Sequence, residues 1–307
     1  MTKIDLRAAL RCLAVAWSLL SASVAAADAQ NLPALQALQA RHTALEKELA
    51  HNDFGRPLHL ESQQIADNLS GDIHAVLEHP FARLNAALDA ADHWCDILIL
   101  HINIKQCRSS GEPPASKLVV YIGTKHAQSL ESAQRVLFDF RVQADSAEYL
   151  RVELHADQGP LSTRNFRIVL EAMPLGAGRS FIHLSYAYTY GMVARMAMQA
   201  YLGTIGSGKV GFSVTGHAAD GRPIYVGDVR GVVERNTMRY YLAIDTYVAT
   251  FDSAPQGQID RRLRRWFVAT EQYARQLHEL EEVEYLEMKR GEIDRQRSRS
   301  PRSGGAG

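Results

Sequence analysis

The fold is decided by five short segments, KLVVYI (117–122), RVLFDFRV (135–142), YLRVEL (149–154), NFRIVL (165–170) and FIHLSYAYTY (181–190). The even-numbered positions of all five are apolar, while charged and polar residues fall at odd-numbered positions. Because successive side chains of a strand point to opposite faces, this alternation predicts strands with one buried face. Gly, Pro, Asp and Ser residues between the segments predict the turns of an antiparallel meander. One apolar face of a curved sheet must then be covered by helices.

The covering helix is predicted C-terminal to the meander. From about Val229 to Phe251, apolar residues recur at intervals of three and four, which indicates a long amphipathic helix. A second amphipathic helix is predicted from Gln258. Between the meander and the long helix, residues 192–202 are helix-like and rich in methionine, and residues 209–215 are predicted to form a short strand.

Further elements are predicted before the meander. Residues 31–50 form an amphipathic helix, suited to packing or to tethering. Residues 58–77 contain an opening strand that is expected to end at Ser70-Gly71-Asp72. Pro80 is expected to begin a helix reaching about Ala91, followed by Trp94 as a large anchor between helix and sheet.

This order of elements, from Leu58 to Phe251 with Trp94 after the first helix, resembles the START-like (SRPBCC) superfamily. The segment GPLSTRNF (159–166), which leads into a central strand, adds to the resemblance. The resemblance implies an α+β helix-grip fold, a curved antiparallel sheet gripping a long C-terminal helix, here with additional N- and C-terminal helices. Proteins of this superfamily typically hold a lipid or another apolar molecule between the sheet and that helix.

The N-terminus has the pattern of an export signal. Lys3, Arg7 and Arg11 precede a largely apolar stretch, and Ala27-Asp28-Ala29 fits a cleavage site before Gln30. An uncleaved anchor is the alternative, and no stable transmembrane segment is expected after cleavage. The sequence thus divides into a signal peptide (1–29), an N-terminal helical segment (30–57), a helix-grip domain (58–256), a C-terminal amphipathic helix (257–294) and a disordered tail (295–307).

Cysteine usage agrees with an exported, periplasmic or secreted protein. Cys95 and Cys107 remain after removal of the leader, and an even pair in an oxidising compartment is most simply a disulfide. Bridged Cα atoms lie about 4.4–6.8 Å apart, so the chain would have to turn back between these residues. Spacing alone does not decide whether the bridge forms.

Charge and motifs exclude several classes of function. Lys and Arg total 34, as do Asp and Glu, so no basic face for nucleic acid is expected. The histidines, among them His101, His155, His183 and His217, lack metal-ligand spacing. No nucleophile elbow is present. We therefore expect no metal, no cofactor and no catalytic residues. The acidic stretch Glu279, Glu281, Glu282, Glu284 and Glu287 is most simply a solvated helix face, with a protein partner as the alternative.

Candidate ligand-binding residues come from polar groups on apolar faces. Asn236 falls inside the apolar stripe of the long helix and Arg239 at its edge, so both need a partner from the protein or from a ligand. Three tyrosines end the last strand of the meander on its apolar face, and two methionines follow them. Those five residues are Tyr186, Tyr188, Tyr190, Met192 and Met196.

Three functions remain open from sequence. The first is an exported, non-enzymatic carrier or sensor of an apolar or lipid-like small molecule. The second is an enzyme acting on a lipid-like or polyketide-like substrate in the same cavity, which would require His183 or Glu171 to point inward. The third is a filled core without ligand, serving protein contacts through the C-terminal helix.

Overall fold

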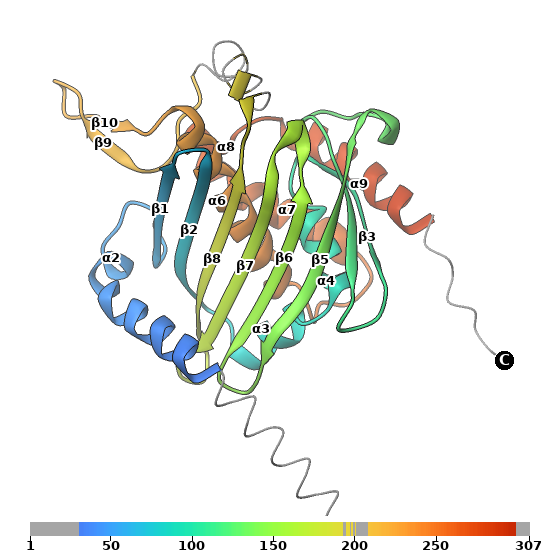
Figure 1. The fold of residues 1–307 in the computed structure, drawn as a ribbon, viewed down its shortest axis with the longest axis horizontal. Coiled ribbons are helices and arrows are strands. Elements are labelled where there is room, and N and C mark those ends of the chain that lie inside the picture. Colours follow the sequence, from blue (N-terminus) through green and yellow to red (C-terminus); the bar gives the residue numbers. More distant parts are fainter. Residues whose placement is uncertain (1–30, 193–194, 197, 199, 201–207, 299–307) are drawn as a thin grey trace, which may run out of the picture.

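The computed structural model describes residues 31–192, 195–196, 198, 200 and 208–298 (Figure 1). The predicted leader at 1–29, part of the methionine-rich segment 192–202 and the tail from 299 onwards lie outside the described residues. Within the described part, no helix is long and apolar enough to cross a membrane.

One curved antiparallel sheet forms the centre of the molecule, with strand order β1-β2-β8-β7-β6-β5-β4-β3. The meander predicted between residues 117 and 190 is confirmed as β4 to β8, each strand paired with the next along the chain. The strands are β1 (Leu58–Ile65), β2 (Asn68–Leu77), β3 (Ile104–Ser110), β4 (Lys117–Ile122), β5 (Gln134–Asp145), β6 (Leu150–Gln158), β7 (Arg164–Pro174) and β8 (Ser180–Thr189).

The even-numbered face of the meander is the inner face, as the alternation predicts. Leu118, Val152, Leu154, Leu170 and Leu184 are fully buried in the main core. The long helix α6 (Asp228–Ala249) crosses this face and contacts β1, β2 and β8. Figure 1 shows the helices behind the sheet, with α6 central among them. The helix-grip fold predicted from the order of elements is therefore confirmed.

Shorter helices complete the inner layer. α3 (Phe81–Leu88) and α4 (Ala91–Leu98) connect β2 to β3, and Trp94 lies in α4, where its indole N–H donates to the Leu88 carbonyl at 2.8 Å. The predicted disulfide is present between α4 and β3, with the Cα atoms of Cys95 and Cys107 5.1 Å apart. The chain does turn back between the two cysteines.

The outer face is partly covered by the N-terminal helix. Residues 31–44 are helical and continue into α2 (Glu46–Ala50). Leu38 and Leu49 of this segment pack with Tyr149, Met173 and Phe181 in a second, smaller core. This contact explains why Tyr149 and Phe181, at odd positions, are buried. The N-terminal segment therefore packs on the sheet.

The opening strand was expected to end at Ser70-Gly71-Asp72, but this prediction is wrong. These residues lie inside β2, the second strand of a β1–β2 hairpin. Gly71 is needed there because the sheet approaches α6 closely. A Cβ added at Gly71 would lie 2.4 Å from the Thr237 hydroxyl oxygen and 3.4 Å from the Val233 carbonyl oxygen. The glycine marks a close approach of helix and strand, which sequence alone does not distinguish from a turn.

Two predictions C-terminal to the meander are wrong in detail. The strand expected at 209–215 is β9 (Val214–His217), which pairs with β10 (Pro223–Tyr225) in a separate hairpin. The helix expected over 257–294 is three helices, α7 (Gln258–Glu271), α8 (Ala274–Leu277) and α9 (Glu282–Ser298). The chain folds back between them, so that α9 packs on α7 and β3. Residues 295–298, expected in the disordered tail, belong to α9.

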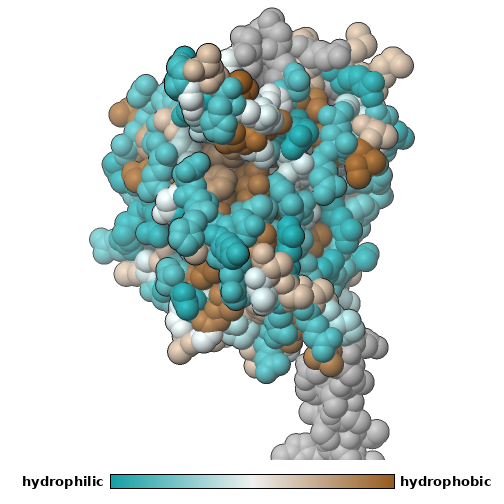
Figure 2. Space-filling view, turned by 90° about the vertical axis from the view of Figure 1, so that its left-hand side faces the viewer, coloured by the Kyte–Doolittle hydropathy of each residue, from teal (hydrophilic) through white to brown (hydrophobic). Residues whose placement is uncertain are grey.

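The surface beside the β1 edge is mainly hydrophilic, with small separate hydrophobic areas (Figure 2). Isolated apolar residues on a surface are ordinary for a folded chain and do not by themselves mark a binding site.

Substituting Gly71 with alanine tests the close approach of α6 to β2. We expect Gly71→Ala to lower the free energy of unfolding by about 1–3 kcal/mol, because the added methyl group overpacks against Thr237. Urea unfolding measures the loss. Gly178→Ala is the control, since a Cβ there meets nothing within 4 Å. Equal stability of the two variants would contradict the account.

Candidate functional site

A cavity of about 310 Å³ lies between the inner face of the sheet and α6. Its walls come from strands β4, β7 and β8, from the segment between α4 and β3, and from the helix α6. Its lining consists of His101, Asn103, Ile104, Ile122, Pro160, Leu161, Thr163, Phe166, Tyr186, Tyr188, Met198, Val232, Asn236 and Tyr240. Among these side chains there is no carboxylate, lysine or arginine. The walls are apolar and aromatic, interrupted by a few hydroxyl, amide and imidazole groups.

Three of the predicted residues meet at this cavity. Tyr186 and Tyr188 project from β8, and Asn236 projects from α6 opposite them. The rings of Tyr186 and Phe166 pack edge to face with centroids 5.3 Å apart, and Tyr240 of α6 lies 5.3 Å from Tyr186. The aromatic rings therefore form one connected wall from strand to helix.

The tyrosine hydroxyls of this wall stay protonated. Burial raises the pKa of Tyr186 well above its ordinary value, with the neighbouring Tyr240 and Tyr188 adding to the rise and the Asn236 amide opposing it. Burial likewise raises the pKa of Tyr188 and Tyr240. At neutral pH these groups are uncharged donors and acceptors of hydrogen bonds.

His101 is a site residue that the sequence did not predict. It follows α4, is 3% exposed and lies against Tyr240, with ring centroids 4.8 Å apart and ring planes tilted by 31°. Its Nδ1 accepts the backbone N–H of Asn103 at 3.2 Å. Burial lowers its pKa well below the ordinary value, and the charges of Arg239, Lys289 and Lys105 lower it further, so the imidazole is neutral. Neither strand parity nor metal-ligand spacing applies to a histidine in a loop, which is why no sequence signal identified it.

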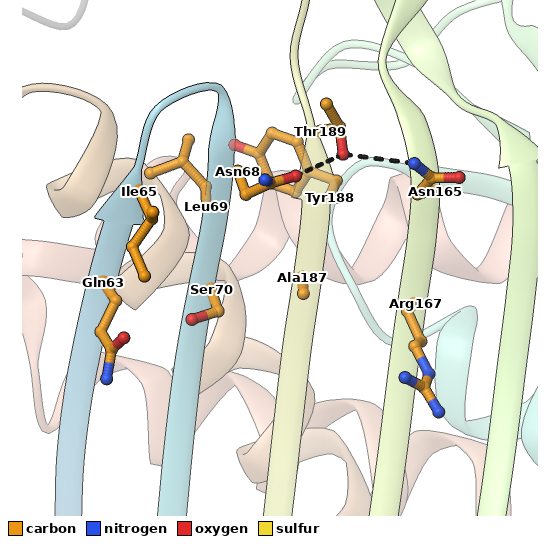
Figure 3. A pocket seen from close by; sticks show the side chains of 10 residues that line it. All are labelled: Gln63, Ile65, Asn68, Leu69, Ser70, Asn165, Arg167, Ala187, Tyr188 and Thr189. Atoms are coloured by element: carbon orange, nitrogen blue, oxygen red, sulfur yellow. Dashed lines mark hydrogen bonds between the residues drawn. The ribbon is translucent and has the colours of Figure 1, made fainter.

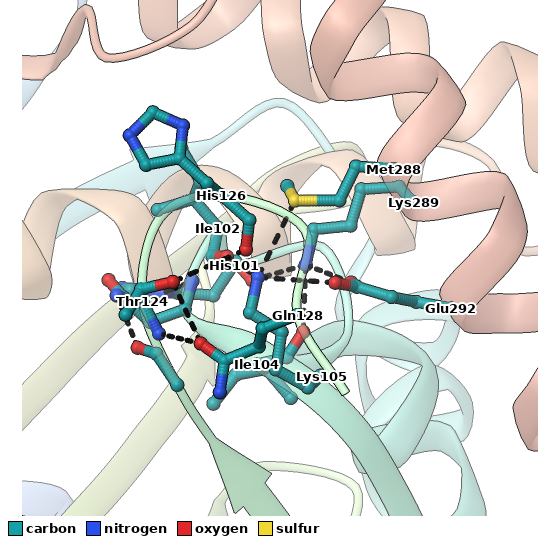
Figure 4. Close-up of polar contacts among 12 residues, drawn as sticks. His101, Ile102, Ile104, Lys105, Thr124, His126, Gln128, Met288, Lys289 and Glu292 are labelled. Carbon is teal, nitrogen blue, oxygen red and sulfur yellow. Dashed lines mark hydrogen bonds and ion pairs between the residues drawn. The ribbon is translucent and has the colours of Figure 1, made fainter. Parts of the chain in front are cut away.

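A buried ionic cluster holds the segment that carries His101 in place. The cluster consists of Lys105 of β3 and of Lys289 and Glu292 of α9 (Figure 4). Lys289 Nζ donates to the carbonyl oxygens of His101 and Ile104, both at 2.8 Å, and to Glu292 Oε2 at 2.8 Å. Lys105 Nζ lies 3.1 Å from Glu292 Oε1. Burial lowers the pKa of Lys289 to about 8, although Glu292 opposes this. Breaking a buried ion pair is strongly destabilising, so the cluster holds α9 and the His101 loop together.

Arg239 does not line the cavity. Its guanidinium lies 2.9 Å from Glu279 Oε1 and donates to the Leu277 carbonyl at 3.2 Å. Lys125 and Lys209 also pair with Glu279. Glu279 is thus buried among three cations, and the interpretation of the whole acidic stretch as a solvated face is wrong for this residue. Arg239 therefore meets its need for a partner inside the protein.

The other candidate residues also lie away from the cavity. The Tyr190 hydroxyl accepts from Gln64 Nε2 at 2.7 Å, and its ring lies below the guanidinium of Arg195. Met192 and Met196 are 78% and 65% exposed. Met198, which was not singled out, is the methionine of this segment that lines the cavity. Ligand binding by any of these residues stays a prediction.

His183 and Glu171, which an enzyme reading would need inside, lie on the opposite, outer face of the sheet. His183 lies between two carboxylates, with Nδ1 3.0 Å from Glu171 Oε2 and Nε2 3.0 Å from Asp72 Oδ1. Its ring stacks on His74 at 4.4 Å. Tyr149 donates to Glu171 as well. Because both ring nitrogens contact carboxylates, His183 is an imidazolium, and its role is to stabilise the outer face of the sheet.

The pKa values on the outer face follow from this arrangement. Burial by itself lowers the pKa of His183, but the hydrogen bonds to Asp72 and Glu171 outweigh it and raise the pKa to about 9. Burial would raise the pKa of Glu171, and the bonds from His183 and Tyr149 instead lower it to about 2. Burial and the charge on His183 lower the pKa of His74 to about 3.

Two other hollows are less suited to an apolar ligand. One, of about 220 Å³, lies on the outer face across β1, β2, β8 and β7, where Thr189 joins Asn68 and Asn165 by hydrogen bonds (Figure 3). Most of the residues that line it are polar or charged. The other is larger, about 1090 Å³, but it is an acidic groove near β5 rather than a space beneath α6. Its carboxylates are Asp89, Asp92, Glu112 and Asp145.

Solved structures that are similar to this chain include three at low sequence identity. No family model and no curated protein matches the chain. Human StAR-related lipid transfer protein 5 is 7% identical, over 73% of this chain and 98% of its own, with a TM-score of 0.39. Ara h 8.0201 is 14% identical, over 63% and 99%, with a TM-score of 0.34. A norcoclaurine synthase point mutant from Thalictrum flavum is 13% identical, over 47% and 91%, with a TM-score of 0.32. At these values the likeness carries no argument about ligand or activity.

Replacing His183 tests the ion pairs of the outer face. Below about pH 6.5 this histidine is protonated in both the folded and the unfolded state. Between pH 6.5 and 9 only the folded state keeps the proton, so its stabilising contribution declines as the pH rises through this window. Between pH 6.5 and 9, we expect the free energy of unfolding of wild type to fall by up to about 3 kcal/mol because His183 loses its proton. The His183→Gln variant should not show this decrease. Urea unfolding at several pH values measures it.

The exposed His126 provides the control for that experiment, and His126→Gln should follow the wild-type pH profile. If wild type and His183→Gln changed in parallel between pH 6.5 and 9, the pairing of His183 with both carboxylates would be refuted.

Proposed function

We propose that this protein binds an apolar small molecule in the cavity between the sheet and α6, as a carrier or sensor. The observation that carries the proposal is the cavity itself, whose apolar and aromatic walls enclose a few uncharged polar groups. Small-molecule sites generally combine such walls with a small number of polar groups that orient the ligand. The inner face of the sheet is not packed solid, which argues against the filled-core alternative.

The size of the cavity limits the ligand. A volume of about 310 Å³ lies at the lower end of the range of about 300–1,000 Å³ that is usual for small-molecule sites. A small mono- or bicyclic molecule fits within this space, whereas a complete two-chain membrane lipid would extend beyond it. Among lipid-like molecules, the proposal therefore favours small ones.

The polar groups of the cavity favour binding over catalysis. General acid–base chemistry requires a group whose pKa lies near the working pH. The tyrosines have raised pKa values and the imidazole of His101 has a lowered one. Within the described lining no carboxylate or amine is placed to exchange a proton. We therefore favour the carrier or sensor over the enzyme.

We further propose that the protein is exported. The basic, apolar and small-residue order of residues 3–29 supports this, and so does the disulfide between Cys95 and Cys107, since such bonds persist in oxidising compartments. Mass spectrometry of protein recovered from the periplasm or medium tests it. A chain beginning at Gln30 is expected, and a full-length chain confined to the cytoplasm would refute export.

Filling the cavity tests the proposed function. We expect Val232→Trp, on the cavity side of α6, to weaken the binding of naphthalene at least tenfold, because the indole takes up the space the ligand needs. Isothermal titration calorimetry measures the affinity. Val268→Trp, on the exposed side of α7, is the matched control and should bind as wild type does.

If both tryptophan variants lose binding, or if neither does, binding of naphthalene does not depend on the space beside Val232. The binding site would then not be this cavity. Undetectable binding of naphthalene to wild type would refute a cavity open to apolar molecules of this size.

A further inference from the structure

Asn103 lies in the loop between α4 and β3 and belongs to the lining of the cavity. Its backbone and its side-chain nitrogen have partners within the protein. The backbone N–H donates to His101 Nδ1 at 3.2 Å, and the backbone carbonyl accepts from the Gly123 N–H at 2.7 Å. The side-chain nitrogen donates to the Gly123 carbonyl at 2.8 Å. The side-chain oxygen, Oδ1, is the exception, because it forms no hydrogen bond with a described residue.

The direction of that oxygen is fixed by the amide that carries it. A backbone carbonyl only accepts hydrogen bonds, so the group of Asn103 that faces the Gly123 carbonyl must be the NH₂ group. The oxygen of the same planar amide then points away from that carbonyl. It also keeps accessible surface, unlike enclosed atoms that lack a partner, such as His101 Nε2 and Asn85 Oδ1. The lining therefore includes an accessible acceptor for which the described residues supply no donor.

The loop holds this acceptor in place. Lys289 Nζ donates to the carbonyl oxygens of His101 and Ile104, both at 2.8 Å, on either side of Asn103 in the chain. The two hydrogen bonds with Gly123 join Asn103 itself to the end of β4. Because the residue is already ordered, little conformational freedom is lost when a donor binds to it. The oxygen is thus preorganised for a donor that comes from a ligand.

Hydroxyl groups of the protein lie in the same lining. The hydroxyls of Tyr188 and Tyr240 form no hydrogen bond with a described residue, and they too keep accessible surface. A phenol hydroxyl can donate as well as accept. A ligand hydroxyl has the same two capacities, since its O–H donates and its oxygen accepts. It therefore suits a lining that combines an amide acceptor with tyrosine hydroxyls.

The surroundings also determine the charge of the ligand. A cationic ligand finds no carboxylate in the described lining, and an anionic ligand finds no lysine or arginine there. Burying an unpaired charge is far more costly than burying a neutral polar group. An uncharged polar group is the one that this site accommodates.

We propose that the ligand of this cavity is an uncharged apolar molecule with a hydroxyl group, an alcohol or a phenol, whose O–H donates to Oδ1 of Asn103. This inference rests on the proposed function and adds the chemical class of the ligand. The hydroxyl end lies at the loop between α4 and β3, and the hydrocarbon part lies against Phe166 and Tyr186.

A series of probes on one bicyclic skeleton tests the inference without any mutation. The neutral probes are 1-naphthol, 1-methoxynaphthalene, which keeps the oxygen but lacks the O–H, and naphthalene. The charged probes are the anion 1-naphthoate and the cation 1-naphthylmethylammonium. We expect wild type to bind 1-naphthol about tenfold more tightly than either other neutral probe, as one neutral hydrogen bond provides, and to bind both charged probes more weakly than naphthalene. Isothermal titration calorimetry at pH 7 gives the affinities.

A substitution assigns the effect to Asn103. Asn103→Leu keeps a side chain of similar size but has no acceptor, so it should bind 1-naphthol and naphthalene equally and retain the affinity for naphthalene. Asn85→Leu, the same change on α3 and outside the lining, is the matched control and should keep the wild-type preference for 1-naphthol. Thermal unfolding confirms that each variant is folded, and the wild-type probe series decides the ligand class even if one is not.

The outcomes separate this inference from the proposed function. Equal binding of 1-naphthol and naphthalene to wild type, or binding of 1-methoxynaphthalene as tight as that of 1-naphthol, would overturn the hydroxyl donor and leave the apolar cavity standing. An unchanged preference in Asn103→Leu would overturn the assignment to its Oδ1. Tightest binding of a charged probe would overturn the uncharged ligand. If no probe binds, both the ligand class and the proposed function fail.

Discussion

The close contact between α6 and the β1–β2 side of the sheet is the constraint on which the rest of the structure depends. At Gly71 the strand has no side chain, and Thr237 of the helix occupies the space instead. Because α6 contacts β1, β2 and β8, it leaves room over β7 and β4, which lie farther from the β1 edge of the sheet. The cavity occupies that room. A helix packed evenly along the sheet would close it, so the position of α6 determines both the stability of the core and the presence of a site.

A loop, residues 99–103, forms the wall of the cavity opposite β7 and β8, and contacts with neighbouring elements hold this loop in place. The contacts are the disulfide, a hydrogen bond from Tyr285 to the Leu100 carbonyl at 3.0 Å, and the buried cluster of Lys105, Lys289 and Glu292. These contacts all tie the loop to α4, β3 or α9. The additional C-terminal helices therefore serve the site indirectly, by fixing the loop that carries His101. This role differs from the protein-partner role considered from the sequence, since the apolar side of α9 is already covered.

Features of the fold and of the site that depend on local sequence patterns could be predicted from the sequence. Features that depend on contacts between residues far apart in the chain could not. Alternation along β4 to β8 and the spacing of apolar residues in α6 are local patterns, and both predicted the observed elements. Asn236, Tyr186 and Tyr188 were found because each breaks a local apolar pattern. His101, Lys289 and the partner of Arg239 were not found, because their roles arise from contacts between residues 38 to 188 positions apart. Gly71 was misread as a turn for the same reason, since the helix it accommodates lies far along the chain.

The proposed function requires that an apolar molecule enters the space between the sheet and α6. The most direct test is a titration of methyl-labelled protein with naphthalene, followed by nuclear magnetic resonance. Saturable shifts are expected for the methyl groups of Ile104, Ile122 and Val232, which line the cavity, and none for those of Val268 and Val283, which are exposed on α7 and α9. Shifts confined to the exposed methyl groups, or none at any methyl group, would contradict it.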